Sequence, residues 1–184
     1  PEAYLKGTAD WRTDLYSAEP ATLMTHAESI TLFQSLGAEF TPELKAPSVD
    51  MPYNGFTQAD YAQKLVDEYK AADIPPSDVW LQSFSLEDVL YWNEAEPEFG
   101  AQAVYLMDEY DTDGYSPMDA GTWPNTMEEL KSMGVNYIAP PTWMLMTTSA
   151  GGEIVPSELA VQAKVAGLEI ITRTIERSGP LKDR

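Results

Sequence analysis

The feature that most constrains the fold of this 184-residue chain is a local pattern that recurs five times. Each copy has a helix-opening residue, an amphipathic run, a break and a short β-rich run. In the first copy, Thr25-His26-Ala27-Glu28 has the spacing of a capping box, and Gly37 stands where a helix commonly ends. The pattern predicts helices that open near residues 25, 57, 85, 125 and 157, each followed by a strand, over residues 38–45, 78–84, 101–107, 135–139 and 168–172.

Helices that alternate with strands across short joints predict an α/β fold with a parallel sheet. The longer and more polar connections follow the strands, over residues 46–56, 108–124 and 140–155. A TIM (β/α)8 barrel has this asymmetry because its βα loops build the active face, and an open doubly wound sheet is the alternative. A closed barrel has eight strands and needs about 250 residues. The sequence is therefore too short for the barrel that its pattern resembles.

In the barrel interpretation, residues 1–184 are a single domain that forms a partial TIM barrel, with about the last five strands and their helices. A free-standing five-stranded α/β domain is the alternative. Residues 1–23 do not follow the pattern, and we expect a leading loop or excursion there. The opening Pro1-Glu2-Ala3 suggests a processed product, a fragment or a partial record. Part of a barrel exposes sheet edges and an apolar face, which favours a longer parent, a second chain or a dimer.

The charge and the composition exclude several classes of function. The chain has 11 Lys and Arg residues against 30 Asp and Glu residues, a formal net charge of −19. This balance argues against nucleic acid or an anionic membrane as a partner, because phosphate binding needs clustered basic residues. The chain has no cysteine, which excludes disulfides, thiolate metal sites and thiol nucleophiles. No stretch of 18 apolar residues is present, so we expect no transmembrane segment.

Candidate functional residues lie where the predicted strands end, because this edge of a parallel sheet carries the ligand sites. They are Glu43, Lys45, Gln82, Phe84, Asp108, Glu109, Pro140, Pro141, Trp143, Thr172, Arg173 and Thr174. Strand alternation places Glu43 and Lys45 on the same side. A carboxylate and an ammonium in this arrangement can hold a metal ion and a phosphate oxygen that share a site. The alternative is an incidental ion pair at a solvated strand end.

Three other features carry weaker predictions. The stretch from Asp111 to Gly114 matches the start of a calcium-binding EF-hand loop, but Ala120 occupies the position of the bidentate glutamate, so an acidic turn is favoured. His26 lies at a helix start, where a capping or surface role is expected. Trp143 follows a strand end and could line the wall of a substrate site.

The run from Phe40 to Lys45 resembles the mid-chain Glu-x-Lys strand of the glycerophosphodiester phosphodiesterases, which are metal-dependent TIM-barrel hydrolases. The resemblance continues at Trp80–Phe84, which is similar to the Gln-Ser-Phe strand of that family. It extends to Gly134–Pro140 and to Ala166–Thr174, which resembles the last barrel strand. The order and spacing agree over roughly residues 24–178, and the long loops are most similar to the bacterial periplasmic or secreted branch.

The resemblance implies roles for a few residues. Glu43 matches an acidic metal ligand, so a divalent cation, Ca²⁺ or Mg²⁺, is the implied cofactor. Lys45 matches the lysine that faces the substrate phosphate, and Gln82 and Phe84 match residues that line the pocket. Many relatives carry tryptophan at the position of Arg173, so this residue either contacts phosphate or faces solvent.

The resemblance also implies what this chain lacks. The acid/base pair of the family is two histidines, in a His-Arg and a His-Asp motif, and neither motif occurs here. We therefore expect no catalytic residue in this chain, and a histidine pair in the missing N-terminal half of the barrel or in a second chain. The expected activity is hydrolysis of a glycerophosphodiester to glycerol 3-phosphate and an alcohol by a periplasmic or secreted protein, with the isolated chain inactive. The alternative is a non-catalytic secreted binding or structural module that retains the scaffold.

Overall fold

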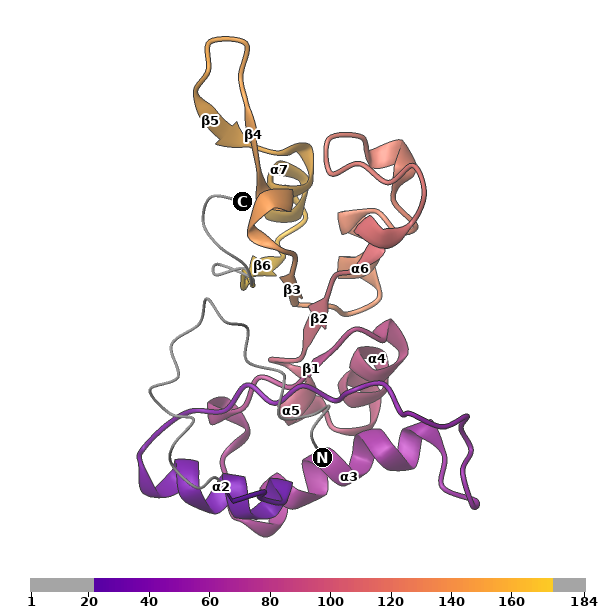
Figure 1. Cartoon of the computed structure of the whole chain (residues 1–184), viewed down its shortest axis with the longest axis vertical. Helices are drawn as coiled ribbons and strands as arrows, with labels where there is room; N and C mark the ends of the chain where they lie inside the picture. The colour runs from indigo at the N-terminus through magenta and orange to yellow at the C-terminus, as the bar shows by residue number, and fades with distance from the viewer. Residues whose placement is uncertain (1–21, 174–184) are drawn as a thin grey trace, which may run out of the picture.

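A computed structural model describes residues 22–173, in which helices and short strands alternate along the chain (Figure 1). The helices are α2 (His26–Ser35), α3 (Gln58–Ala71), α4 (Leu86–Ala95), α5 (Pro97–Gly100), α6 (Met127–Ser132) and α7 (Glu158–Val165). The strands are β1 (Gln82–Ser83), β2 (Val104–Leu106), β3 (Tyr137–Ala139), β4 (Met146–Thr148), β5 (Ile154–Pro156) and β6 (Glu169–Ile170). The leading loop expected over residues 1–23 lies almost entirely outside the described residues.

The main sheet is parallel, with the strand order β1-β2-β3-β6. A further extended segment joins it at β1, through parallel bridges from Phe40 to Val79 and from Glu43 to Gln82. Five extended segments thus lie side by side in the order in which they occur in the sequence. The predicted α/β class and parallel sheet are confirmed. Within residues 22–173 the strand order does not reverse, as it does in a doubly wound sheet.

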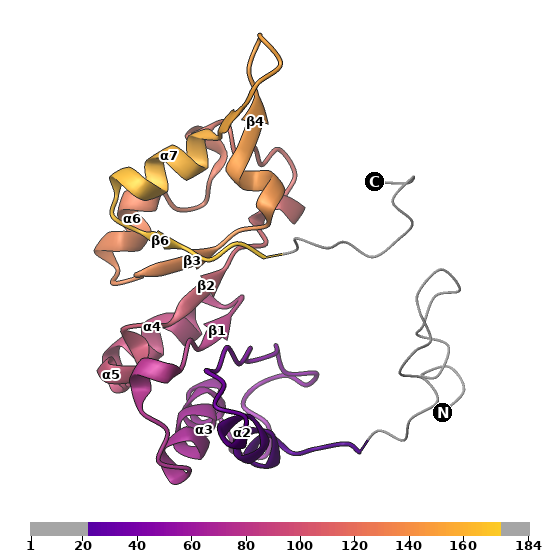
Figure 2. The same cartoon turned by 90° about the vertical axis from the view of Figure 1, so that its left-hand side faces the viewer.

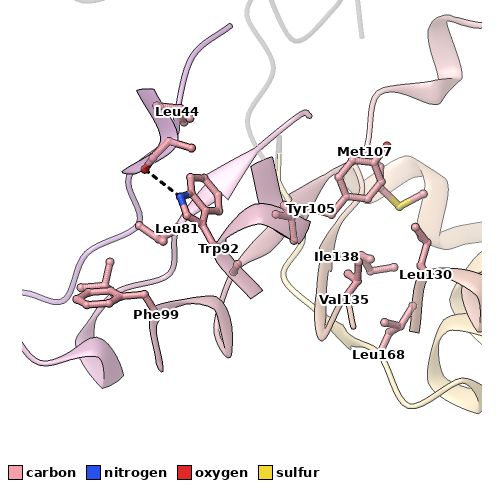
Figure 3. Close-up of a cluster of buried hydrophobic side chains, with 14 of the residues drawn as sticks. Leu44, Leu81, Trp92, Phe99, Tyr105, Met107, Leu130, Val135, Ile138 and Leu168 are labelled. Atoms are coloured by element: carbon pink, nitrogen blue, oxygen red, sulfur yellow. Dashed lines mark hydrogen bonds between the residues drawn. The ribbon is translucent and has the colours of Figure 1, made fainter. Parts of the chain in front are cut away.

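The two faces of the sheet differ in what covers them. Strand residues on one face pack against the helices and form the main core, and Figure 3 shows Leu81, Tyr105, Ile138 and Leu168 among them. Figure 2 shows α4, α5, α6 and α7 on this side of the sheet. The opposite face, called here the inner face, carries a smaller apolar cluster built from Trp80, Phe84, Val104, Leu106, Tyr137, Ala139 and Ile171. The central strand β2, Val104–Leu106, is buried on both faces, which explains its apolar sequence.

Helices α3 and α4 are held together by a buried tryptophan. Trp92 is fully buried, and its indole N–H donates to the carbonyl oxygen of Ala62 at 3.0 Å (Figure 3). Helix α5 follows α4 directly and packs so closely on it that a Cβ at Gly100 would lie 2.5 Å from the carbonyl oxygen of Trp92. A side chain at position 100 would therefore separate the two helices.

Threonine N-caps begin three of the helices, in agreement with the predicted starts at Thr25 and Thr57. Thr25, Thr57 and Thr126 each form a capping box. The threonine hydroxyl accepts from the backbone N–H of the residue three positions later, and the carboxylate of that residue accepts from the threonine N–H. Two of the four N–H groups left unpaired at each helix start thereby gain partners.

Two elements were not predicted from the sequence. No helix was predicted between the one that opens near residue 85 and the strand over 101–107, but proline is compatible with the first turn of a helix and α5 forms there. The connection over residues 140–155 contains the antiparallel hairpin β4–β5, whose turn includes Gly152 at φ 82°. The strand predicted over residues 38–45 is reduced to two bridges, because Pro42 between them has no N–H to pair.

Within residues 22–173, none of the helices combines the length and the apolar character that crossing a bilayer requires.

Gly100→Ala is expected to destabilise the protein by about 1–3 kcal/mol, because the added methyl group forces α5 away from α4. Gly151→Ala is the matched control, since a Cβ there meets only the Ser149 hydroxyl, at 3.7 Å. Urea unfolding monitored by tryptophan fluorescence measures both free energies. Equal stability of the two variants would contradict the close packing of α4 and α5.

The capping boxes predict a defined loss of stability in acid. Hydrogen bonds from the backbone and hydroxyl of the N-cap threonine lower the pKa values of Glu28, Asp60 and Glu129 below their ordinary range. Because the pKa values are lower in the folded than in the unfolded state, this stabilisation is complete above the ordinary carboxyl pKa and is lost as the pH falls below about 4.5. The triple variant E28Q/D60N/E129Q should therefore lose less of its Tm between pH 6 and pH 3 than the parent. Parallel Tm curves for the two proteins would contradict this assignment.

Candidate functional site

The predicted pair Glu43 and Lys45 meets at the end of the first extended segment. The ammonium nitrogen of Lys45 lies 2.8 Å from Oε1 of Glu43, so both side chains point to the same side, as the alternation predicts. The Lys45 side chain is 76% exposed and that of Glu43 is 27% exposed. Such a pair adds about 1 kcal/mol or less to stability. Both groups can therefore exchange this contact for a ligand at low cost.

Gln82 and Phe84 lie beside this pair on the next strand. The backbone of Gln82 donates to the carbonyl of Pro42 and accepts from the N–H of Leu44, both at 2.8 Å, which places Gln82 opposite Glu43. Phe84 follows two residues later on the same face and joins the apolar cluster of the inner face. The structure thus places four of the predicted site residues on two neighbouring extended segments: Glu43, Lys45, Gln82 and Phe84.

Arg173 does not simply face solvent, and whether it also contacts a phosphate stays a prediction. Its guanidinium donates to the backbone carbonyl of Ala139 at 3.1 Å, to that of Met107, and to the hydroxyl of Tyr110 at 3.4 Å. It also lies over the Phe84 ring, 4.9 Å from the ring centroid. Arg173 therefore links the ends of β2, β3 and the last extended segment rather than facing solvent.

An aromatic pair continues the site beyond Arg173. Trp143 lies on a 3-10 turn (Thr142–Leu145), is 43% exposed, and meets Tyr110 edge-on with 5.6 Å between ring centroids. Tyr110 also lies 5.8 Å below the Arg173 guanidinium. Sequence reasoning missed Tyr110, whose one signal is its place in the polar connection after the third strand. Arg173 thus joins the aromatic part of the site to Phe84.

A buried aspartate positions the end of β1. Asp88 is 4% exposed and accepts hydrogen bonds from Gln58 at 2.8 Å and from the Ser83 hydroxyl at 2.7 Å. The Ser83 oxygen in turn accepts from the N–H of Ser85. These bonds connect α3, β1 and α4 at the edge of a hollow of about 310 Å³ that Phe84 also lines.

Of the other carboxylates at the strand ends, Glu109 belongs to the helix side of the sheet. One of its oxygens accepts from the Tyr105 hydroxyl at 2.6 Å, and its other oxygen and the Tyr115 hydroxyl are buried without a partner among the described residues. Burial, and then the charge of Glu109, raise the pKa values of Tyr105 and Tyr115 well above the ordinary range. Glu109 is therefore bound to Tyr105 on the helix side of the sheet and does not face the pair at Glu43.

His26 lies at the start of α2 but is not its cap, because Thr25 holds that position. Its Nδ1 is 2.6 Å from Oε2 of Glu68, and its Nε2 is 3.3 Å from the Tyr69 hydroxyl. Burial alone would raise the pKa of Glu68, but hydrogen bonds from Lys64 and His26 outweigh this effect and the pKa is lowered. His26 thus has a half-buried structural role that ties α2 to α3.

The described residues near Glu43 do not by themselves complete a metal site. A Ca²⁺ or Mg²⁺ ion requires about six or more oxygen ligands. This strand end offers the carboxylate of Glu43 and the side-chain oxygen of Gln82, and across residues 22–173 there is no group of three acidic or histidine side chains suited to a metal. A cation bound here would need further ligands from elsewhere in the protein.

Comparison with known proteins defines the class first. A solved structure of a candidate glycerophosphoryl diester phosphodiesterase from Silicibacter pomeroyi DSS-3 shares the fold, with a TM-score of 0.57 and 18% sequence identity. The match covers 82% of this chain and 45% of that one, so this chain spans less than half of the solved structure. The shared fold is α/β with a parallel sheet. No family model matches the sequence.

The family follows from a curated relative. The chain is 44% identical over 179 residues to a protein of Arthroderma benhamiae named "Extracellular protein". The match includes 97% of this chain and 71% of the relative. The chain therefore belongs to the same family as this extracellular protein.

Arg173→Ala is expected to reduce the free energy of unfolding by about 1.5–3 kcal/mol, because hydrogen bonds to a charged donor are lost and the Met107 carbonyl loses its partner. Arg173→Lys should recover little of this, since lysine lacks the planar fork of donors. Lys45→Ala is the control and should change stability by about 1 kcal/mol or less. If Arg173→Ala is as stable as Lys45→Ala, the guanidinium does not hold the strand ends.

Proposed function

We propose that this chain is part of a metal-dependent phosphodiester hydrolase that converts glycerophosphodiesters to glycerol 3-phosphate and an alcohol. The chain would form the last five strands of a (β/α)8 barrel and supply only part of the active site. The observation that carries this proposal is the pair of Glu43 and Lys45 beside Gln82, at the carboxyl edge of a parallel sheet. The fold shared with the Silicibacter pomeroyi protein supports the same class of reaction.

The charges at this strand end suit a phosphodiester. Lys45 is a mobile, exposed ammonium group that can reach a phosphate oxygen, in a protein whose acidity otherwise repels anions. Glu43 would provide one ligand to a divalent cation, Ca²⁺ or Mg²⁺. To bind the cation, its carboxylate would give up the ion pair with Lys45. When bound, such a cation supplies charge stabilisation to the phosphoryl oxygens. Phe84 and Trp143 offer aromatic surface to the remainder of the substrate.

The groups that transfer protons would come from outside this chain. Phosphodiester cleavage needs a general acid for the leaving alcohol and a base for water. His26 is engaged with Glu68 and Tyr69, and we assign it no proton transfer. We therefore propose that the catalytic histidines and further metal ligands lie in another segment or chain, and that the isolated chain is inactive. The name of the Arthroderma relative favours secretion as the location.

The second candidate is a non-catalytic secreted module that binds a phosphate or sugar ligand on the same scaffold. Arg173 is its supporting observation, because this cation is committed to backbone carbonyls rather than left free for a reacting phosphate. The module would use Lys45, Gln82 and the aromatic side chains for binding and would need no acid/base pair.

Glu43→Gln should remove most of the hydrolytic activity of the longest natural protein that contains this chain, because the amide no longer carries the charge that a divalent cation requires. Lys45→Met should reduce kcat/KM by roughly 100-fold, since a positive group near the reacting phosphate is lost. Release of glycerol 3-phosphate from a glycerophosphodiester, with Ca²⁺ or Mg²⁺ present, measures both effects.

Glu39→Gln is the matched control, because this exposed carboxylate lies on the same segment at some distance from the strand end. A fully active Glu43→Gln protein would overturn the proposed role of Glu43. Absence of hydrolysis in the parent protein, combined with measurable binding of glycerol 3-phosphate, would favour the non-catalytic module.

A further inference from the structure

A β-hairpin projects from the connection between β3 and α7. Strands β4 and β5 pair antiparallel, with Met146 opposite Pro156 and Thr148 opposite Ile154. Figures 1 and 2 both show this hairpin extending beyond the helices at the same end of the molecule. Its strands are each about 10 Å long, since a strand rises about 3.4 Å per residue. The hairpin therefore presents its side chains to whatever lies outside the protein.

The base of the hairpin is fixed by buried groups. Met144 and Ser157, on either side of it, are fully buried. The Ser157 hydroxyl donates to the carbonyl oxygen of Met144 at 2.6 Å, and its backbone N–H donates to that of Leu145 at 3.0 Å. At the tip, the N–H of Ser149 donates to the carbonyl oxygen of Glu153 at 2.8 Å. The hairpin is thus a hydrogen-bonded projection with a firm base.

One face of the hairpin is apolar and exposed. Met146 is 42% exposed, Ile154 is 76% exposed, and Pro156 is exposed opposite Met146. Strand alternation places these three side chains and that of Thr148 on the same face. Trp143, which is 43% exposed, lies on the turn that leads directly into β4. The face thus combines three apolar side chains and a hydroxyl with an aromatic ring near its base.

Absence of charge distinguishes this hairpin from other exposed apolar positions. Such positions also occur elsewhere in the described part of the chain, among them Tyr53, Phe56, Met118 and Met133. Each of these four has a charged residue within four positions in the sequence. In contrast, no residue from Ser132 to Gly152 is charged, and the longest such run elsewhere covers only residues 29–38. An uncharged projection is exceptional in a protein with a formal net charge of −19.

The single charged residue between Ser132 and Ser157 is Glu153. It precedes Ile154 by one position, so strand alternation directs its carboxylate to the opposite face of the hairpin. The apolar face therefore carries no charge of its own. Because removal of a charge from water is costly, a face without charge is suited to contact with a medium of lower polarity.

We propose that the hairpin β4–β5 is a lipid-contact element that rests in the headgroup region of a zwitterionic phospholipid surface. Met146 and Ile154 would reach the boundary between headgroups and acyl chains, and Trp143 would lie among the headgroups, where tryptophan is enriched. A projection of about 10 Å matches the depth of about 5–10 Å that interfacial elements reach. The outer backbone edges of the two strands need water, which also keeps the hairpin out of the hydrocarbon core.

The charge of the protein decides which surface fits. A formal net charge of −19 repels an anionic lipid surface, whereas a zwitterionic surface exerts no such repulsion. A second copy of the chain is a poorer partner, because two copies repel one another and a hairpin of this size offers far less than the roughly 800 Å² per partner of a stable interface. This inference goes beyond the proposed function and does not rest on it.

Co-sedimentation of the longest natural protein that contains this chain with phosphatidylcholine vesicles tests the proposal. The protein should pellet with the vesicles at millimolar lipid, and no more strongly when about 30% of the lipid is phosphatidylserine. Ile154→Asp should weaken binding at least about tenfold, because the new carboxylate would have to leave water. Val165→Asp is the matched control, since it adds the same charge at an 84% exposed valine at the far end of α7, and should bind as the parent does.

Ala150→Trp gives an independent readout that a folding defect cannot imitate. Ala150 is exposed in the turn of the hairpin, so an indole ring there adds apolar surface and should strengthen binding at least about fivefold. Circular dichroism shows whether Ile154→Asp is folded, and if it is not, the result with Ala150→Trp decides alone.

Four results would overturn the proposal. They are absence of binding to phosphatidylcholine, binding of folded Ile154→Asp that is no weaker than that of Val165→Asp, no gain with Ala150→Trp, and stronger binding when phosphatidylserine is present. A smaller assembly of Ile154→Asp than of the parent in analytical ultracentrifugation without lipid would also overturn it, and would identify a second copy as the partner. Vesicle binding needs no hydrolysis, so it should persist in Glu43→Gln, and the two proposals can fail separately.

Discussion

Each strand of the parallel sheet depends for its backbone hydrogen bonds on a strand that belongs to another unit of the chain. A parallel strand cannot return as a hairpin, so each pairing requires a helical crossover that also covers the sheet. The strands are short, and in the first segment Pro42 lacks the N–H that would donate to the neighbouring strand between the bonds of Phe40 and Leu44. The order of the sheet, the helix-side core and the gathering of side chains at the carboxyl edge all follow from this one pairing scheme.

Much of this scheme could be predicted from local chemistry. The capping threonines and the glycines after the helices marked where each unit begins and turns. The order of strands agrees with the rule that consecutive units lie next to one another. The hairpin β4–β5 could not be recognised in the same way, because its strands have three residues each and lack a sustained alternation. Helix α5 was missed because proline and glycine, read as a break, also suit the two ends of a short helix.

The contact between Glu43 and Lys45 was predictable from the sequence, whereas the contacts of Arg173 were not. Glu43 and Lys45 are two residues apart on one strand, so their meeting depends on local alternation alone. The contacts of Arg173 involve Met107 and Tyr110, more than 60 residues away, and depend on how three strand ends are placed in space. Only the tertiary structure could show that this guanidinium donates to backbone carbonyl oxygens.

The hydrogen bonds of Arg173 to the strand ends bear on how the fold responds to acid. The backbone acceptors of its guanidinium are uncharged carbonyl oxygens, which acid does not protonate in the range where carboxylates titrate. The carboxylates of the capping boxes, in contrast, lose their charge in acid. The ends of β2 and β3 are therefore held through neutral acceptors, while the helix starts are held through carboxylates. Acidification would weaken the helix starts before it weakened the contacts of Arg173 with the strand ends.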